Sequence, residues 1–196
     1  DSYIDIWRDN TPKSILEIAH KYTENGQKKL ANLAVLNSLS KRSNAAGLRA
    51  GFLCADPDVI LSYSKIAANG LALVPTPLLN VSAEIYRDTV HNKMVREHYN
   101  RAFKIAEQYL KCSIPDAGFF LWLPVGDDIT CTKLLWEHMA IKVIPGSYMA
   151  VANNGTNPAS GYIRIAMVHR LDIIEEAMKR LQRFFQNIWQ EHQIND

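Results

Sequence analysis

The distribution of apolar residues predicts two buried strands in the first third of the chain. "LANLAVLN" at 30–37 and "LRAGFLCA" at 48–55 are short and almost continuously apolar, and polar residues bound both of them. Such runs are typical of strands that are covered on both faces of a sheet. An alternating pattern, "DSYIDIW" at 1–7, predicts a further strand at the start of the chain.

Helical spacing of apolar residues predicts helices between residues 14 and 110. Ser14 can cap a helix that runs to about residue 20 or 22. Asp56 and Pro57 start a second helix, which "VPTPLLN" at 74–80 breaks. A long helical stretch, with room for one interruption, then keeps one apolar face to about Leu110.

The second half of the chain alternates between strands and helices. The predicted elements are strands at 119–125, 141–144 and 161–168 and helices at 130–139 and 171–189. The turn cluster "SIPDAG" at 113–118 separates them from the long helical stretch. The pattern predicts an α/β chain in which 1–110 is part of one layered domain and 111–196 is a smaller α/β unit.

Composition and charge exclude several classes of protein. The chain has 196 residues, of which 47% are hydrophobic and 21% charged, and its net charge of +2 argues against a nucleic-acid binder with a concentrated basic face. No apolar run approaches the roughly 20 residues of a membrane span. Three widely spaced cysteines favour a reduced, cytoplasmic protein over a disulfide framework. The six histidines show no metal-ligand spacing, so we predict no metal site.

The segment at 37–49 places a lysine and an arginine between the two predicted buried strands. Lys41 follows the first strand, at the kind of position where open α/β sheets bind ligands. Ser38 lies just before it and Arg49 begins the next apolar run, so a hydroxyl and a guanidinium can form an anion clamp beside the amine. A desolvated amine beside an arginine is a nucleophile for carbonyls. The pattern predicts a Schiff base beside a phosphate, and a solvated loop lysine is the alternative.

Several motifs, in order along the chain, resemble one family. "NSLSKRSNAAGLRAGF" at 37–52 resembles the lysine motif of class I/II aminotransferases, which are pyridoxal-phosphate enzymes of fold type I, in the version found in succinyldiaminopimelate aminotransferases. "DSYIDIW" resembles the Asp-x-x-Tyr strand end of this family. "AGFFLWLPV", "IKVIPGSYMA" and "GYIRIAMV" resemble the strands of its small C-terminal domain. The resemblance implies the C-terminal part of the large cofactor-binding domain, a mixed sheet with helices, followed by the small α/β domain.

The resemblance also implies a role for individual residues. Lys41 matches the lysine that holds pyridoxal 5'-phosphate as a Schiff base and then moves a proton on the substrate. Ser38 and Arg49 match the residues that bind the cofactor phosphate. Tyr3 matches the tyrosine that donates a hydrogen bond to the oxygen on the cofactor ring. Arg164 matches the arginine that binds the substrate α-carboxylate, and a planar guanidinium suits a carboxylate in a bidentate manner.

The sequence departs from the family pattern at two positions and lacks its upstream half. Only Ser2 separates Asp1 from Tyr3, whereas the family places two residues between its ring-nitrogen aspartate and the tyrosine, so Asp1 is not that aspartate. Ala46 stands where these motifs often have proline. The Gly-rich phosphate loop, the stacking aromatic and the ring-oxygen asparagine would precede residue 1. We therefore expect the C-terminal half of a longer enzyme, inactive alone.

The resemblance implies transamination. Glutamate is the implied amino donor, and the acceptor could be N-succinyl-2-amino-6-ketopimelate of lysine and diaminopimelate biosynthesis. The complete enzyme would be a homodimer acting on amino-acid and keto-acid substrates, with no nucleic-acid or membrane partner. Two alternatives stay open, namely a pyridoxal-phosphate-dependent C–S or β-lyase and an aminotransferase-like sensor domain of a transcription regulator.

Overall fold

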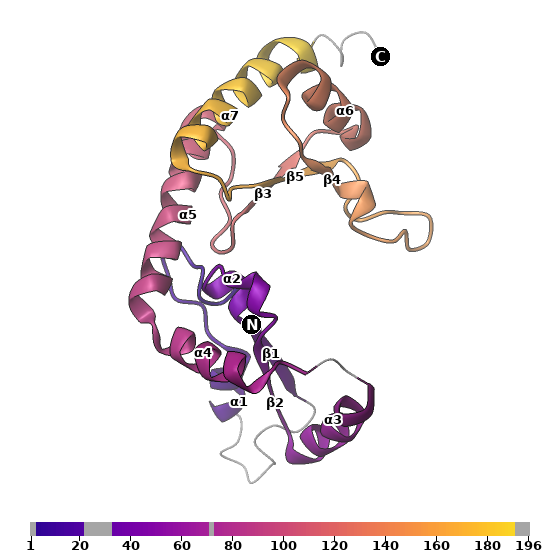
Figure 1. The fold of residues 1–196 in the computed structure, drawn as a ribbon. Coiled ribbons are helices and arrows are strands. Elements are labelled where there is room, and N and C mark those ends of the chain that lie inside the picture. The colour runs from indigo at the N-terminus through magenta and orange to yellow at the C-terminus, as the bar shows by residue number, and fades with distance from the viewer. Residues whose placement is uncertain (1–2, 22–32, 71–72, 191–196) are drawn as a thin grey trace. The chain divides into compact units, whose positions relative to one another are not determined.

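A computed structural model describes residues 3–21, 33–70 and 73–190 of the chain (Figure 1). Its helices are α1 (Ile15–Lys21), α2 (Leu39–Arg42), α3 (Pro57–Gly70), α4 (Thr76–Arg87), α5 (Thr89–Leu110), α6 (Asp128–Met139) and α7 (Leu171–Arg183). Its strands are β1 (Ala34–Ser38), β2 (Gly51–Ala55), β3 (Phe120–Pro124), β4 (Ile144–Pro145) and β5 (Tyr162–Ala166). Short 3₁₀ turns lie at η2 (Ala46–Leu48) and η3 (Gly146–Tyr148), and a π-helical turn, η4 (Phe184–Ile188), follows α7.

The chain divides into two compact units. The first comprises Asp1–Glu97 with Asp116–Gly118, and the second comprises His98–Pro115 with Phe119–Asp196. The division therefore falls inside α5, which is one continuous helix, and a short later segment returns to the first unit. The domain boundary between residues 110 and 111 stays a prediction about the family's architecture.

Each unit contains a small antiparallel sheet, which confirms the predicted α/β class. In the first unit β1 pairs with β2 in a hairpin whose register runs from Ala34↔Ala55 to Ser38↔Gly51. In the second unit β5 is the central strand between β3 and β4. The predicted interruption of the long helical stretch is confirmed at Asp88, where α4 ends and α5 begins.

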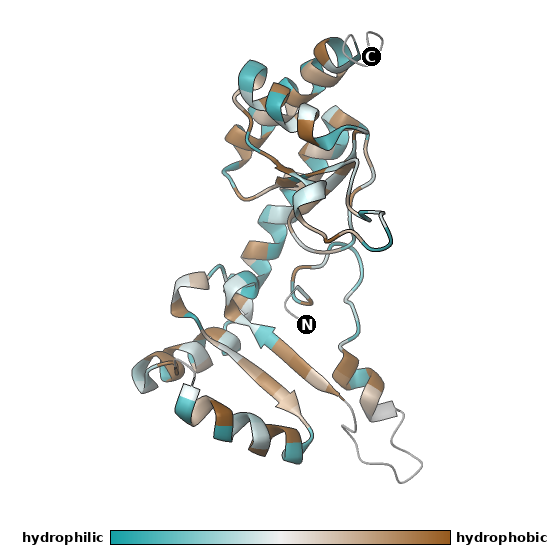
Figure 2. Ribbon diagram, turned by 90° about the vertical axis from the view of Figure 1, so that its right-hand side faces the viewer, coloured by the Kyte–Doolittle hydropathy of each residue, from teal (hydrophilic) through white to brown (hydrophobic). Residues whose placement is uncertain are grey.

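Two predictions about the first unit are wrong. Residues 3–5 form a turn and Trp7 makes an isolated bridge to Ala117, so the alternating pattern near the start does not produce a regular strand. The hairpin is not covered on both faces, because Leu36 is 65% exposed and Phe52 is 46% exposed. Figure 2 shows how hydrophobic these two strands are. Among the described residues β1 and β2 form a sheet of two strands, which is too small to bury both of its faces.

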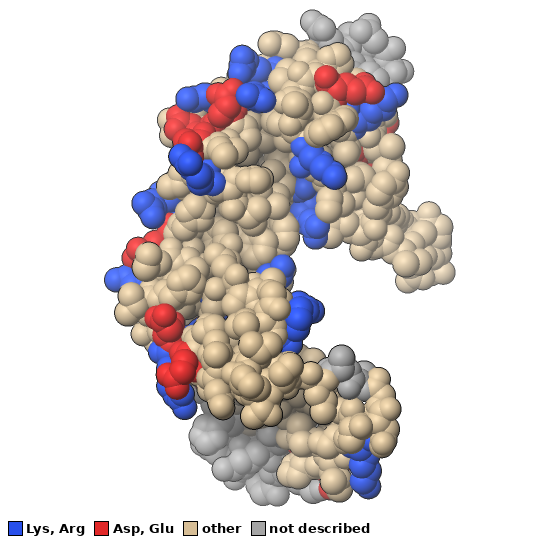
Figure 3. All heavy atoms as spheres, in the orientation of Figure 1, with Lys and Arg blue, Asp and Glu red and all other residues tan. Residues whose placement is uncertain are grey.

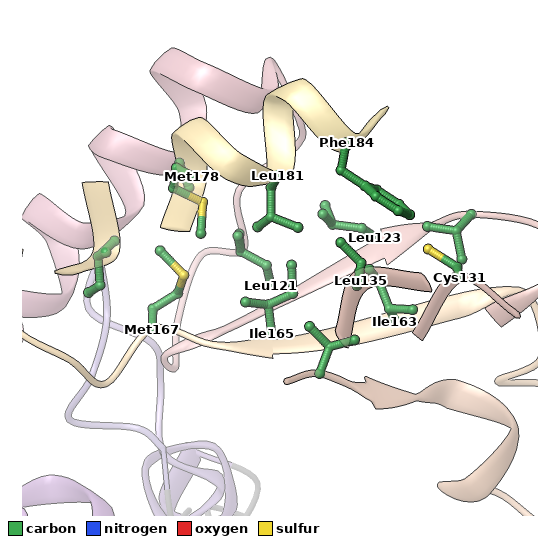
Figure 4. Close-up of a cluster of buried hydrophobic side chains, with 14 of the residues drawn as sticks. Leu121, Leu123, Cys131, Leu135, Ile163, Ile165, Met167, Met178, Leu181 and Phe184 are labelled. Carbon is green, nitrogen blue, oxygen red and sulfur yellow. The ribbon is translucent and has the colours of Figure 1, made fainter. Parts of the chain in front are cut away.

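The core of the second unit lies between its sheet and its helices (Figure 4). Alternate residues of β3 and β5 point into it, as the period of two along a strand requires. The strand residues are Leu121, Leu123, Ile163 and Ile165, and they meet Leu135 of α6 and Met178, Leu181 and Phe184 of the α7–η4 region. The helix predicted at 171–189 is thus confirmed as α7 and η4, with its apolar side in the core.

The outer face of α7 carries charges of both signs. Lys179 lies 2.9 Å from Glu175 and Arg180 lies 2.9 Å from Glu176, in both cases with i,i+4 spacing. Figure 3 shows basic and acidic groups side by side on this part of the surface. Over the described ranges, no helix has the length and hydrophobicity that crossing a membrane requires.

A buried carboxylate holds the loop between β4 and β5. Asp128, in the first turn of α6, is 3% exposed. Its Oδ2 accepts a hydrogen bond from the Ser147 backbone N–H at 2.7 Å, and its Oδ1 accepts one from the Ser147 hydroxyl at 2.9 Å and one from the Gly161 N–H at 3.3 Å. Burial by itself raises the pKa of Asp128, but these hydrogen bonds outweigh it and lower the pKa from its ordinary 3.8.

The same loop is held at two further points. The Asn157 side-chain amide donates to the carbonyl oxygens of Ser147 and Ala150 at 2.9 and 3.2 Å. Gly146 passes so close to the chain that a Cβ there would collide with the carbonyl oxygen of Ala159. The loop between β4 and β5 is therefore attached to α6 through the hydrogen bonds of Asp128.

We expect Asp128→Ala to lower the free energy of unfolding by about 2–4 kcal/mol, because three donors lose a buried charged acceptor. Since the folded-state pKa of Asp128 is lowered, its stabilisation is present above the ordinary pKa and is lost as pH falls through the lowered value. Denaturation curves between pH 3 and pH 7 should thus show a difference from wild type that shrinks below about pH 4. Glu137→Ala, on the same helix but exposed, is the control, and a pH-independent difference for Asp128→Ala would contradict the expectation.

Candidate active site

Lys41 lies on a single helical turn at the end of β1. Ser38 is both the last residue of β1 and the N-cap of α2, and its Oγ accepts a hydrogen bond from the Ser40 N–H at 3.1 Å. The cap explains why the chain turns from strand into helix at this residue. Lys41 is half-buried, in the third position of α2. The local fold places the amine three residues beyond a capped strand end.

The return from Lys41 to β2 is tight. Arg49 has a left-handed backbone with φ of 52°, and its Nη1 donates to the carbonyl oxygen of Ala46 at 3.0 Å. Gly51 lies directly opposite Ser38, and a Cβ at this glycine would collide with the carbonyl oxygen of Asn37. The close approach of β1 and β2 therefore requires glycine at 51. Arg49 is exposed. The buried arginine of the segment is Arg42, which directly follows Lys41.

Arg42, which sequence reasoning did not single out, is 8% exposed. Its Nη1 donates to the carbonyl oxygen of Ile85 at 3.1 Å and its Nη2 donates to that of Tyr86 at 3.0 Å, so it binds the end of α4. Its Nε lies 3.4 Å from Oδ2 of Asp5. The available signal was its position directly after the lysine, but its long-range partners are not visible in the sequence.

Tyr3 lies in the turn that precedes this ion pair. The Ile6 N–H donates to the carbonyl oxygen of Tyr3 at 3.0 Å, and Asp5, between them, reaches Arg42. Trp7 then bridges to Ala117, and the guanidinium of Arg96 lies 3.9 Å from the centroid of its indole. The segment that carries Tyr3 is thus tied to the rest of the first unit at several points. Asp1 lies outside the described residues.

Arg164 belongs to the second unit, on the face of the sheet opposite the core. It lies in the central strand β5, directly between Trp122 of β3 and Ile144 of β4. Its guanidinium carbon lies 4.4 Å from the centroid of the Phe120 ring. This is the distance of a cation–π contact, and a planar guanidinium can bind a carboxylate through its N–H edge.

Aromatic residues surround this arginine. Trp122 stacks on Tyr162 with 5.3 Å between ring centroids and 11° between the planes, and Tyr162 precedes Arg164 on the same face of β5. Sequence reasoning identified Arg164 but missed Phe120 and Trp122, although the alternating pattern of "FFLWLPV" and "GYIRIAMV" places all of them on one face.

The structure therefore places some of the predicted site residues, but not all of them, in one compact unit. Ser38, Lys41 and Arg49 share one hairpin connection, and Tyr3 lies in a segment joined to it by the Asp5–Arg42 pair. Arg164 lies in the other compact unit. Within the described parts of the chain, histidine, cysteine and acidic residues form no group of three or more that could hold a metal ion.

Comparison with curated proteins finds aminotransferases. The chain is 27% identical over 186 residues to the 4-dedimethylamino-4-oxo-anhydrotetracycline transaminase of Streptomyces rimosus, covering 92% of this chain and 49% of that protein. It is 28% identical over 163 residues to the LL-diaminopimelate aminotransferase of Moorella thermoacetica, covering 75% of this chain and 38% of that one. The chain thus spans about half the length, or less, of these relatives.

Solved structures agree on the fold. An aminotransferase from Neisseria meningitidis superposes with a TM-score of 0.84 at 30% identity, covering 94% of this chain and 48% of that one. The aminotransferase AspB from Helicobacter pylori superposes with a TM-score of 0.82 at 26% identity, covering 95% and 48%. The family model for aminotransferase class I and II matches residues 8–181. The chain therefore belongs to the class I and II aminotransferase family.

Proposed function

We propose that this chain is the C-terminal portion of a transaminase that moves an amino group from an amino acid to a keto acid. The observation that carries the proposal is the capped helical turn that presents Lys41 at the end of β1, in a chain whose family match extends over residues 8–181. Enzymes of this family use pyridoxal 5'-phosphate. When bound, this cofactor acts as the electron sink that makes the α-proton of an amino acid acidic.

The residues of the first unit fit this cofactor by their chemistry. The Ser38 hydroxyl accepts from the Ser40 N–H, so its own O–H can donate to a phosphate oxygen. Arg49 uses Nη1 on the Ala46 carbonyl and is otherwise exposed, which suits a second contact to the same phosphate. We assign the phosphate to Ser38 and Arg49 and the aldehyde to the amine of Lys41. Tyr3 would donate from its phenol to the oxygen on the ring.

Lys41 then has a second role as the base. Once the amino group of the substrate has displaced it from the aldehyde, its Nζ would take the proton from the substrate α-carbon and deliver it to C4′ of the cofactor. General acid–base catalysis of this kind contributes about 10²–10⁴ in rate. Arg164 would bind the α-carboxylate with its N–H edge while Phe120 supports the guanidinium face. A substrate held at its carboxylate has its reacting bond oriented before the proton moves.

We also propose a substrate class for this transamination. Relatives that include LL-diaminopimelate aminotransferases support a substrate of the diaminopimelate type. Within that class we propose N-succinyl-2-amino-6-ketopimelate as the acceptor and glutamate as the donor, as the motif around Lys41 implies. The matched relatives are about twice as long as this chain, which supports the view that it is part of a larger enzyme and inactive alone. We further propose that the complete enzyme is a cytoplasmic homodimer.

Covalent capture of the cofactor tests the proposal. The complete polypeptide is mixed with pyridoxal 5'-phosphate, reduced with borohydride, digested and analysed by mass spectrometry. We expect the added mass on the peptide that contains Lys41, because a reduced amine linkage survives digestion. Lys41→Ala should capture no cofactor at this peptide.

Lys65→Ala is the matched control, since Lys65 is an exposed lysine on α3 of the same unit. It should capture cofactor as the wild type does. Capture at other lysines with none at Lys41 in the wild type would refute the assignment. Product analysis separates transfer from the lyase alternative, because a lyase acting on cysteine or serine releases ammonia and pyruvate.

A further inference from the structure

Arg42 makes several specific long-range contacts. Besides the two carbonyl oxygens at the end of α4, its Nη1 lies 3.2 Å from Oγ of Ser43, and its guanidinium lies 5.5 Å from the centroid of the Tyr86 ring. Ile85 and Tyr86, whose carbonyl oxygens accept from Arg42, are 43 and 44 residues away in sequence. An arginine that is 8% exposed and donates to groups this distant in sequence holds its own segment of backbone in one place.

The end of α4 needs such a donor. The last carbonyl groups of a helix have no partner within the helix, and a cation near them also interacts favourably with the helix dipole. Arg42 supplies a donor and a positive charge at Ile85 and Tyr86, next to the break at Asp88, and it shares the Ile85 carbonyl oxygen with the Asp88 backbone N–H at 3.2 Å. Burial raises the pKa of the Tyr86 phenol, which stays protonated and donates to Oδ1 of Asn37 at 3.1 Å. The end of α4 thus also contacts the end of β1.

The start of α5 also contacts the backbone of the turn that carries Lys41 and Arg42. The side-chain amide of Asn92, which is buried, donates to the backbone carbonyl oxygen of Arg42 at 3.1 Å. Nε2 of His91 lies 3.1 Å from the carbonyl oxygen of Ser43. Both the backbone and the side chain of Arg42 are therefore bound to the α4–α5 corner, which we define as residues 85–92.

Lys41 depends on these contacts for its position. A helix of four residues has little intrinsic stability, because nucleation costs more than one turn of hydrogen bonds returns. The turn that carries Lys41 must then be held by tertiary contacts, and those of Arg42 are among them. The ion pair with Asp5 adds the segment that carries Tyr3 to the same arrangement.

We propose that Arg42 is a positioning residue for the reaction: it holds the Lys41 turn and the Tyr3 segment against the α4–α5 corner. The inference rests on the proposed function of Lys41. It deepens that function by assigning the position of the amine to a buried side chain that binds other parts of the protein.

The variants are chosen to separate charge from shape. Arg42→Lys keeps the positive charge but offers one compact donor group, which cannot reach two carbonyl oxygens and a carboxylate together. Arg42→Met keeps the aliphatic stem and removes the charge. Asp5→Asn removes only the ion pair and leaves the corner intact. Arg87→Met is the matched control, since Arg87 lies at the same end of α4 but is exposed and pairs with Glu84 of its own helix.

The experiment uses the complete enzyme and three readouts. We expect Arg42→Lys and Arg42→Met to lower kcat by about 10–100-fold with little change in KM for the amino acid, because a small displacement of a reacting group costs rate. The affinity for pyridoxal 5'-phosphate, measured by fluorescence titration, should fall, and the pH dependence of the absorbance of the bound cofactor should shift. Hydrogen exchange should rise in residues 39–50. Asp5→Asn should show a smaller kcat effect, and Arg87→Met none.

Each outcome decides the proposal. A purely structural role would lower the melting temperature of Arg42→Met and leave kcat, cofactor affinity and the pH dependence of absorbance unchanged at temperatures where the variant is folded, and that result would overturn the inference. If Arg42→Met does not fold, Arg42→Lys with a wild-type kcat would overturn it equally. Absence of cofactor capture at Lys41 in the wild type would instead refute the proposed function, so the two failures are distinguishable.

Discussion

Replacement of Lys41 by alanine in the complete enzyme is expected to lower kcat for transamination by at least about 10³-fold. The variant loses the amine that holds the cofactor aldehyde and the base that moves the α-proton, and no other described residue of the 37–49 segment carries an amine. The measurement is a coupled assay of keto-acid formation with saturating cofactor, so that weaker cofactor binding does not account for the loss.

Lys41→Arg strengthens this test. Arginine keeps the positive charge and a similar length, but its guanidinium stays protonated and can serve neither as nucleophile nor as base. We expect a loss as large as that of the alanine variant. Lys65→Ala should retain wild-type kcat. A Lys41→Ala enzyme that keeps more than about a tenth of wild-type kcat would contradict the catalytic role, because one base is worth at least about 10².

Replacement of Arg164 by methionine is expected to lower kcat/KM for the amino donor by about 10²–10³-fold. Removing one partner of a buried, hydrogen-bonded charge pair costs about 2–5 kcal/mol, and each 1.4 kcal/mol is a factor of ten. Arg164→Lys should recover only a small part of the loss, since an ammonium lacks the planar fork that binds two carboxylate oxygens. Steady-state kinetics with a series of donor concentrations would measure both effects.

A substrate without a carboxylate provides the internal control for Arg164. A primary amine with the same side chain should be a poor substrate of the wild type and should react no worse with Arg164→Met, because the lost contact does not exist for it. Arg170→Met, an exposed arginine of the second unit that pairs with Asp172, should leave kcat/KM unchanged. Equal loss on the amine and on the amino acid would show that Arg164 supports the sheet and does not bind carboxylate.

The sequence predicted the order of the elements well where local patterns dominate. The helical spacing of 171–189 became α7 and η4, with Met178 and Leu181 buried, and the alternation of "FFLWLPV" became β3. It failed at "DSYIDIW", where the same alternation produced a turn and one bridge. A period of two is necessary for a half-buried strand, but a strand also needs a partner with free hydrogen-bonding groups, and the sequence does not show partners.

For the candidate site, the sequence by itself determined which groups are available. A serine, a lysine and an arginine within 12 residues, followed by an arginine inside an apolar strand, define a chemistry for phosphate, aldehyde and carboxylate without any coordinates. Residue type and spacing are local properties, so they can be read directly from the amino-acid sequence.

Only the tertiary structure decided which of these groups are held and by what. It made Arg42 the buried arginine of the motif and left Arg49 exposed, it joined Asp128 to a loop 19 residues away, and it stacked Arg164 on Phe120. The physical reason is that a buried polar group must find partners wherever the fold brings them. Those partners come from distant segments, and their identity is set by packing and not by the neighbouring residues in the chain.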